Sequence, residues 1–241
     1  WDSISDQISK AHQNPAFYMD VLKNKCKYQN IIVDTYWNPG SDNGRPELFT
    51  PSFRLDLFFL GYKKGLRNHD GVSLEERFGE LPDNLPDYVE WVRTWIIRKK
   101  NAGCVALKIA LAYERDLHFE KVTQEQAERV FRVKESDITQ EDIRYFQNYL
   151  FWKICEIAAE LSLPLQCHTG MGQITNTNIL QLNDVIKSNP ETKFVLLHCG
   201  FPWLDDLFPM VDGYQNVYPD LTWVPLLSYT ASNRVLHQLI E

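Results

Sequence analysis

Short apolar runs alternate with amphipathic helical stretches along the chain from about residue 30 onward. Two of these runs end in a histidine, His168 and His198, and a turn signal follows each at once. Residues 176–189 between them have apolar side chains at helical spacing, and Pro190 stops the pattern. One strand–helix–strand crossover has about this length. We therefore expect the two histidines at the carboxyl ends of neighbouring parallel strands.

The remaining pattern predicts four more strands and several helices. The predicted strands are residues 30–36, 52–60, 103–112 and 216–224. The predicted helices are residues 86–100, 139–162 and 232–241, and residues 3–25 also have a helical pattern. Strands that alternate with helices form a parallel sheet. The expected fold class is therefore α/β, a TIM (β/α)8-type barrel of which this chain contains about six strands.

Composition narrows the classes of protein. The chain has 241 residues, of which 44% are hydrophobic, so one domain covering residues 1–241 can bury an ample core. The net charge of −7 argues against a nucleic acid or an anionic membrane as partner and leaves a small-molecule substrate. No apolar run approaches the length of a transmembrane helix, and no signal-peptide pattern is present. The five cysteines show no CxxC spacing, which predicts reduced thiols and a cytoplasmic location.

The histidine pair is the strongest functional signal. Catalytic groups of a β/α barrel gather at the carboxyl ends of its strands. A single histidine there is more often a hydrogen-bonded structural residue, but equivalent positions in successive units favour an active site. We expect the remaining histidines at the surface, because they fall in helices or polar loops: His12, His69, His118 and His237.

Three residues on or after the third strand are candidates for substrate contacts. Lys108 lies near the end of an otherwise apolar strand, so its charge must reach solvent or an anion. It could bind a substrate carboxylate or phosphate at the barrel mouth, or form a salt bridge with Asp34 or Asp56. Tyr113 and Arg115 follow the same strand, and Arg115 could hold a carboxylate with two hydrogen bonds. Loop arginines are more often surface charges, and that alternative stays open.

Other polar and aromatic residues have competing interpretations. Arg54 and Asp56 lie on one face of a predicted strand and are expected to pair with each other. Asp220 could orient His198 as a hydrogen-bonding carboxylate, or it could fix a loop. Trp223 and Trp37 could wall a pocket, although tryptophan in so aromatic a chain is more often core. No P-loop, GxGxxG or GxSxG motif is present, so nucleotide binding and serine-hydrolase chemistry find no support.

With the histidine strands placed, the chain resembles the amidohydrolase-2 family of metal-dependent TIM-barrel enzymes. The matching stretches are residues 103–117, 167–170, 197–202 and 216–223. By this resemblance His168 is a metal ligand, and His198 either approaches the metal or acts as acid/base on a metal-activated water. The implied cofactor is a divalent ion, zinc or alternatively manganese. From their positions on the strands and loops, we also expect Lys108 in the catalytic group and Tyr113, Arg115 and Trp223 at the substrate.

Two elements of that family are absent from the sequence. The family's first strand ends in His-x-His, and its eighth strand ends in a metal-binding aspartate after Gly or Ser. We therefore expect a domain truncated at both ends that holds metal weakly, because affinity comes from several fixed donors together. Exposed apolar flanks of the outer strands would favour a homo-oligomer or poor solubility.

Three functions remain in competition at this stage. The first is a metal-dependent hydrolase of a small amide, ester or lactone that carries a carboxylate. The second, on the same barrel, is a lyase that decarboxylates aromatic acids or an isomerase of uronates. The third is a non-catalytic carbohydrate- or protein-binding module, indicated by the seven tryptophans and the missing ligands.

Overall fold

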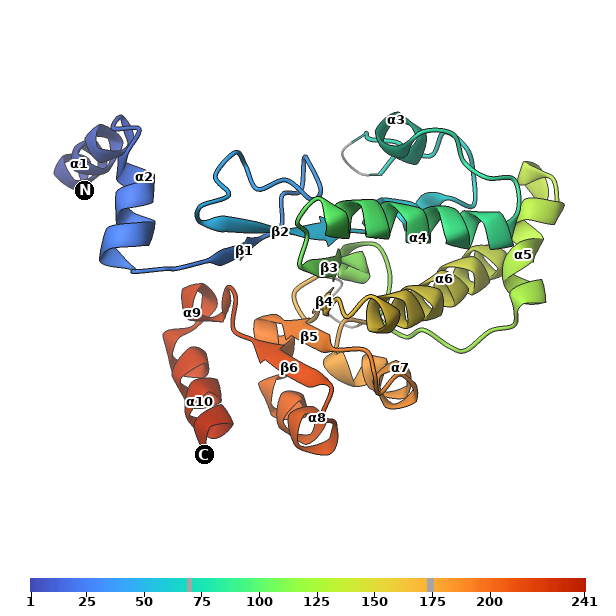
Figure 1. The fold of residues 1–241 in the computed structure, drawn as a ribbon. Coiled ribbons are helices and arrows are strands. Elements are labelled where there is room, and N and C mark those ends of the chain that lie inside the picture. Colours follow the sequence, from blue (N-terminus) through green and yellow to red (C-terminus); the bar gives the residue numbers. More distant parts are fainter. Residues whose placement is uncertain (69–70, 173–175) are drawn as a thin grey trace.

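A computed structural model describes residues 1–68, 71–172 and 176–241 (Figure 1). The strands are β1 Ile31–Val33, β2 Phe49–Arg54, β3 Ala106–Ile109, β4 Leu165–His168, β5 Phe194–Leu197 and β6 Val217–Asp220. The helices are α1 Asp2–His12, α2 Phe17–Met19, α3 Leu74–Phe78, α4 Leu85–Asn101, α5 Gln124–Arg132, α6 Gln140–Glu160, α7 Asn183–Ser188, α8 Leu207–Gly213, α9 Val224–Leu227 and α10 Tyr229–Ile240.

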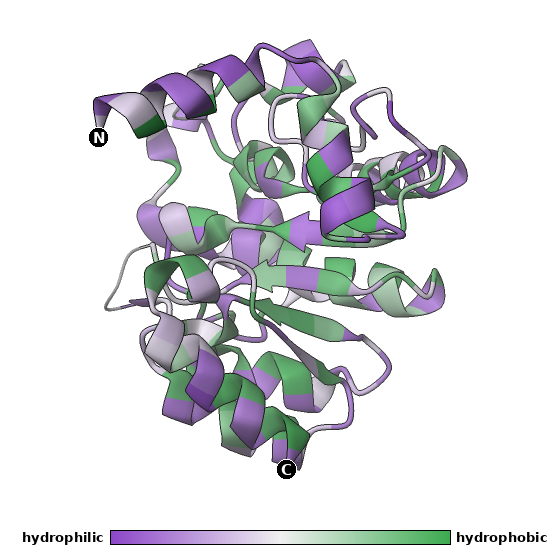
Figure 2. Cartoon of the chain, turned by 90° about the vertical axis from the view of Figure 1, so that its left-hand side faces the viewer, coloured by the Kyte–Doolittle hydropathy of each residue, from purple (hydrophilic) through white to green (hydrophobic). Residues whose placement is uncertain are grey.

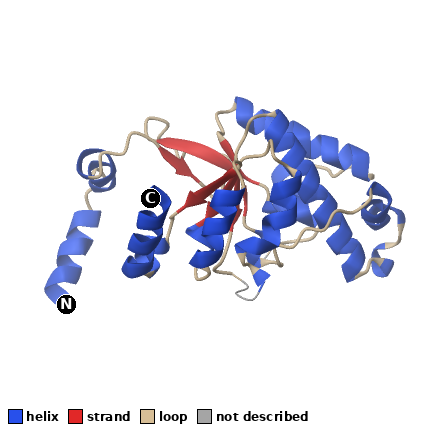
Figure 3. Cartoon of the chain, turned by 90° about the horizontal axis from the view of Figure 1, so that it is seen from below, coloured by secondary structure: helices blue, strands red, loops and turns tan. Residues whose placement is uncertain are grey.

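The six strands form one parallel sheet in chain order, β1 to β6, curled into a half-barrel. Each strand pairs in parallel with the next one along the chain, and helices form most of the connections. The helices lie outside the strands, which Figure 3 shows from below. The predicted parallel α/β architecture with six strands is therefore confirmed.

Alternation along the strands separates the core from the concave face. Phe53, Leu107 and Leu165 point outward and are fully buried against the helices, in the main hydrophobic cluster. The side chains at the alternate positions of these strands, such as Lys108 and Gln166, point to the other face and line a cavity on the concave side. In Figure 2 the strands at the centre are largely green, whereas the N-terminal helix is mainly purple.

Capping residues explain where the long helices begin. Thr139 accepts a hydrogen bond from the Asp142 backbone amide, and the Asp142 carboxylate accepts one from the Thr139 amide, a capping box that starts α6 as predicted. Thr123 and Gln126 form the same arrangement at the start of α5, which the apolar pattern alone does not reveal. Asn84 caps α4, so this helix begins at Leu85.

The four strands predicted at residues 30–36, 52–60, 103–112 and 216–224 are all shorter in the structure. The predicted strand 52–60 is wrong in its second half, because residues 56–60 form a 3₁₀ helix. Its apolar run packs as a short helix in which Phe58 and Phe59 are buried. The predicted strand 216–224 ends at Asp220, and Trp223 follows in a left-handed turn with φ of 69°.

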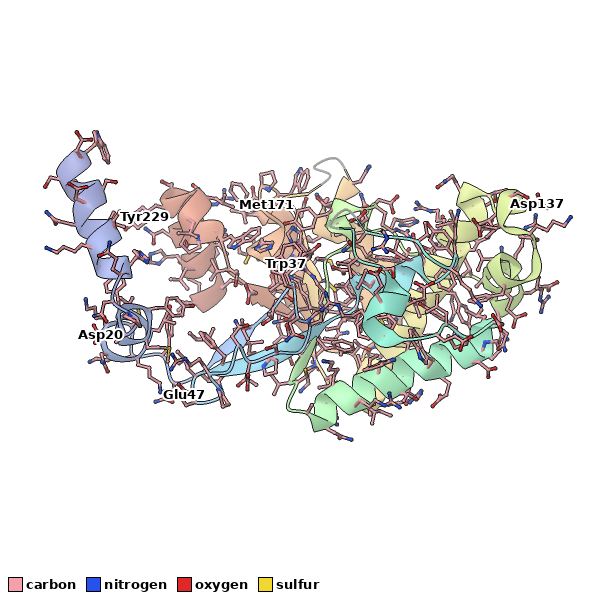
Figure 4. The ribbon with its side chains drawn as sticks, turned by 90° about the horizontal axis from the view of Figure 1, so that it is seen from above. Asp20, Trp37, Glu47, Asp137, Met171 and Tyr229 are labelled. Carbon is pink, nitrogen blue, oxygen red and sulfur yellow. The ribbon has the colours of Figure 1, made fainter. Side chains whose placement is uncertain are left out.

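The N-terminal helices project from the body of the protein. Helix α1 has no buried residue, and Figures 1 and 4 show it extending away from the sheet. The predicted helical segment 3–25 is observed as α1, α2 and a π-helix over Asp20–Lys25. Among the described residues, no helix combines the length and the apolar character that crossing a bilayer requires.

Candidate active site

A cavity of about 870 Å³ opens at the carboxyl ends of the strands. His168 and His198 line it together with Lys108, Tyr113 and Trp223. Trp37, from the loop after β1, also contributes to the wall, and Figure 4 shows it in the central part of the molecule with Met171 from the loop after β4. The fold thus brings five of the six predicted site residues to one cavity.

Strand register places the lining side chains in rows. Arg54 pairs with Lys108, and Lys108 pairs with Gln166, so these residues form one row across β2, β3 and β4. His168 lies two residues beyond Gln166 and therefore points to the same side of β4. Its row continues across β5 to Asp220 at the end of β6. Polar chemistry is thus concentrated on the inner positions of three central strands.

The two predicted imidazoles are in direct contact. His168 Nδ1 and His198 Nε2 lie 3.2 Å apart, and the ring centroids are separated by 4.4 Å. Both side chains are almost completely buried. The prediction that these histidines share one edge of the sheet is confirmed.

The outer nitrogens of the two rings determine the tautomers. His168 Nε2 lies 2.5 Å from the Met171 carbonyl oxygen, and His198 Nδ1 lies 2.7 Å from that of Thr222. Since a carbonyl oxygen only accepts, each of these nitrogens carries the proton and donates. In the neutral rings, the two nitrogens that face each other are both unprotonated, and their lone pairs converge.

Burial keeps both rings neutral at physiological pH. Burial, assisted by the adjacent His198 and Lys108 and opposed by the hydrogen bond to Met171, lowers the pKa of His168 to about 3. Burial also lowers the pKa of His198, against the hydrogen bond to Thr222. Two neutral lone-pair donors that face each other across 3.2 Å form an arrangement that a shared proton or a cation would stabilise.

Thr169 links the two strand ends that carry the histidines. Its buried hydroxyl donates to the Leu197 carbonyl at 2.6 Å and accepts from the Gly200 amide at 3.1 Å. These two bonds span a turn in which His198, Cys199 and Gly200 all have positive φ, from 51° to 71°. Left-handed backbone is unfavourable for residues with a Cβ atom, so surrounding contacts must hold it. The residue after His168 therefore helps to fix the position of His198.

The lysine and the arginine of the polar row differ in their partners. Arg54 lies 2.9 Å from Asp56 and 3.5 Å from Asp34, so the predicted Arg54–Asp56 pair is confirmed. Lys108 is 4% exposed, and among the described residues no carboxylate lies within ion-pair distance of its Nζ. Burial lowers the pKa of Lys108 to about 8, although Asp34 and Asp56 favour its charge at longer range. Neither alternative salt bridge forms directly.

Arg115 is the candidate that the fold does not bring to the cavity. Its guanidinium turns toward α6 and donates to Gln147 at 3.1 Å and Asn148 at 2.9 Å. It also donates to the backbone oxygens of Asp116 and His118. The geometry gives no support to a substrate-binding role, because these protein acceptors already occupy the guanidinium.

The aromatic candidates flank the imidazole pair. The Trp223 ring stacks on His198 with centroids 4.6 Å apart and an interplanar angle of 14°. The Tyr113 ring lies 4.5 Å from that of His168. Both side chains are partly exposed and line the cavity, and for Trp223 this agrees with the predicted pocket wall rather than with the core alternative.

Asp220 acts on the loop rather than on the imidazole. Its carboxylate accepts the Thr222 amide at 2.7 Å, and the Thr222 carbonyl in turn holds His198. Of the two roles open from sequence, the structure favours loop fixation. Of the other histidines, His12 and His237 are exposed as expected and His118 is half-buried, while His69 lies outside the described residues.

The sequence analysis missed Gln166 and Thr169. Gln166 stands two residues before His168 on the same strand, and alternation alone would have placed it on the cavity side. Thr169 follows His168 directly, and no spacing rule distinguishes such a bridging hydroxyl from an ordinary loop threonine.

The donor set fits part of a metal site. Zinc–nitrogen bonds are 2.0–2.1 Å long, so two nitrogens on one tetrahedral ion lie about 3.3 Å apart. The observed 3.2 Å between His168 Nδ1 and His198 Nε2 is close to this value. In the part of the chain that the structure describes, no three His, Cys, Asp or Glu side chains are grouped to hold an ion. Among the described residues, the nitrogens whose separation fits a shared ion are therefore His168 Nδ1 and His198 Nε2.

The fold is a half-barrel of parallel strands and helices in which two buried imidazoles converge at the carboxyl ends of adjacent strands. Residues 78–238 match the amidohydrolase family, and the chain belongs to this family. A stretch of 83 residues is 36% identical to protein fluG of Emericella nidulans, covering 32% of this chain and 10% of that protein.

Solved structures share the fold. A provisionally named metal-dependent hydrolase of Lactobacillus casei superposes with a TM-score of 0.72 at 21% identity, over 94% of this chain and 60% of its own. Uronate isomerase of Thermotoga maritima gives a TM-score of 0.59 at 18% identity, over 81% and 49%. The chain thus spans 60% and 49% of the length of these two proteins.

Proposed function

We propose that this protein is a metal-dependent hydrolase that acts on a small, carboxylate-bearing amide or ester. The observation that carries the proposal is the pair of converging imidazole lone pairs, 3.2 Å apart at the carboxyl ends of β4 and β5. Family membership supports a hydrolase-type enzyme. The proposed substrate class is inferred from the side chains that line the cavity.

His168 is the proposed metal ligand through Nδ1. Its opposite nitrogen donates to Met171, which fixes the ring and strengthens Nδ1 as a donor. A bound divalent ion, zinc or manganese, would polarise a substrate carbonyl and lower the pKa of water. Because ligation needs the unprotonated ring, the low pKa of His168 keeps this nitrogen ready at neutral pH.

His198 is the proposed acid/base. Its Nδ1 proton is engaged by Thr222, so Nε2 can accept a proton from an attacking water and return it to the leaving group. The parallel Trp223 ring would stabilise the imidazolium formed in between by a cation–π contact. Lys108, with its charge inside the cavity, would hold the carboxylate of the substrate.

The test compares His168→Ala and His198→Ala with wild type, and uses the exposed His237→Ala as the matched control. After dialysis against zinc or manganese, the proposal expects His168→Ala to lose the metal and His198→Ala to retain most of it. Hydrolysis by His198→Ala should fall by about 10²–10⁴-fold.

The possible outcomes separate the roles. Equal metal loss in both variants would make His198 a second ligand and remove its acid/base assignment. Decarboxylation or sugar-acid isomerisation without hydrolysis, in a screen of carboxylates, would replace hydrolysis by the lyase or isomerase alternative. Unchanged metal content in both variants would leave the histidines as structural residues.

A further inference from the structure

Two polar side chains on the cavity wall, Lys108 and Gln166, make no hydrogen bond or ion pair with the residues that the structure describes. Lys108 and Gln166 are register partners on β3 and β4, where neighbouring strands run about 4.8 Å apart. Within residues 1–68, 71–172 and 176–241, no group hydrogen-bonds to Lys108 Nζ or to the Gln166 amide. Both line the cavity, and Lys108 is 96% buried.

Arg54, in the same row of inward-facing side chains, differs from Lys108 and Gln166 because it has protein partners. Arg54, the other cation of the row, is neutralised by Asp34 and Asp56. Its guanidinium also lies over the Tyr36 ring, 4.7 Å from the centroid. A buried ammonium without a direct counter-ion is costly, and a ligand anion would remove that cost. The neighbouring amide offers a second donor to the same anion.

We propose that Lys108 and Gln166 form a subsite that binds one carboxylate group of the substrate. The Lys108 ammonium donates to one carboxylate oxygen and the Gln166 side-chain NH₂ donates to the other. This inference deepens the proposed hydrolytic function and rests on it for the identity of the ligand as substrate. Binding of the anion itself requires neither metal nor turnover.

Strand geometry also limits the substrate. Gln166 and His168 lie on the same side of β4, two residues and about 6.6 Å apart. A carboxylate held by Gln166 and a carbonyl near the imidazoles are then joined by about four bonds, which span about 5 Å. The geometry favours an N-acyl β-amino acid or an amide of equal spacing over an N-acyl α-amino acid.

The experiment measures binding of N-acetyl-β-alanine by calorimetry and by protein NMR, with EDTA present. Its neutral amide is the charge control, and N-acetylglycine is the spacing control. Lys108→Met and Gln166→Leu remove the two donors at similar volume. Lys187→Met and Gln140→Leu, at exposed positions on α7 and α6, are the matched controls.

Wild type and the control variants should bind N-acetyl-β-alanine more tightly than either control ligand. Lys108→Met should weaken binding by about 10–100-fold and Gln166→Leu by about 3–10-fold. The double variant Lys108→Met/Gln166→Lys should recover binding, because the cation returns to the same row. Thermal melting checks that each variant is folded.

Several results would overturn the subsite: no binding by wild type, equal binding of the neutral amide, or unchanged affinity in folded Lys108→Met. Equal affinity for N-acetylglycine would overturn the four-bond spacing. Binding that follows this pattern without hydrolysis after metal is restored would support the subsite and refute the hydrolase function instead.

Discussion

The buried charge of Lys108 has a consequence for stability that can be measured without knowing the substrate. Burial lowers its pKa from 10.5 to about 8. This difference corresponds to about 3 kcal/mol by which the native state disfavours the ammonium relative to the unfolded chain. Replacing Lys108 by Met removes the charge and keeps an apolar chain of similar length. We expect Lys108→Met to be more stable than wild type at pH 7 by up to about that amount.

The sign of the pH dependence follows from the lowered pKa. Between about pH 8 and 10.5 the unfolded lysine holds a proton that the native lysine has lost, so wild-type stability gains from this group as pH rises. The methionine variant lacks that gain. Its advantage over wild type should therefore be full below about pH 8 and vanish near pH 10.5, where both states of the lysine are neutral.

Urea unfolding from pH 7 to 10.5, with EDTA present, gives the free energy of unfolding for both proteins. Other titrating groups occur in both and cancel in the difference. Lys187→Met, at an exposed position, is the matched control. A Lys108→Met protein that is less stable at pH 7, or whose difference from wild type is the same at pH 7 and 10.5, would refute the reasoning.

Two further predictions concern positioning and framework. Thr169→Val removes the hydroxyl between the strand ends and should weaken zinc binding by about 10–100-fold, whereas Thr169→Ser should retain zinc binding. Equilibrium dialysis measures zinc binding by both variants. Equal loss of zinc binding in both would contradict the role of the hydroxyl. Arg115→Met leaves the buried Asn148 and the half-buried Gln147 of α6 without this donor and should lower the free energy of unfolding by about 3 kcal/mol. It should spare N-acetyl-β-alanine binding in the folded protein. A stable Arg115→Met that no longer binds the ligand would return Arg115 to the substrate site.

The strand ends were predictable because apolar runs and turn signals mark them directly. His168 and His198 each close such a run, and parallel topology then forces them to one edge. The strand prediction for residues 56–60 was wrong because it also relied on an apolar run. Such a run with one charged residue has the same sequence pattern whether it forms a strand or a short 3₁₀ helix. The choice between strand and 3₁₀ helix for these residues depends on which side chains become buried. Burial in turn depends on residues that are distant in sequence.

The direction in which loop side chains point was the property of the site that the sequence predicted least well. Tyr113 and Arg115 both follow β3, but Tyr113 faces His168 whereas Arg115 turns to Asn148 on α6. No local pattern separates them, because the two side chains on α6 that accept hydrogen bonds from the arginine lie more than thirty positions further along the chain. Strand positions such as Gln166 are different, since alternation fixes their direction from sequence alone.

That alternation makes β4 a natural unit for redesign. Gln166 and His168 share its inner side, while Cys167 between them is buried on the outer side against the helices. Position 166 can therefore be varied to accept other ligand head groups while the metal-binding candidate stays in place. A one-residue insertion in the same strand would exchange the two sides and point a thiol into the cavity. Substitutions in this strand can therefore change ligand specificity while His168 keeps its position, whereas a change in the length of the strand moves His168 out of the cavity.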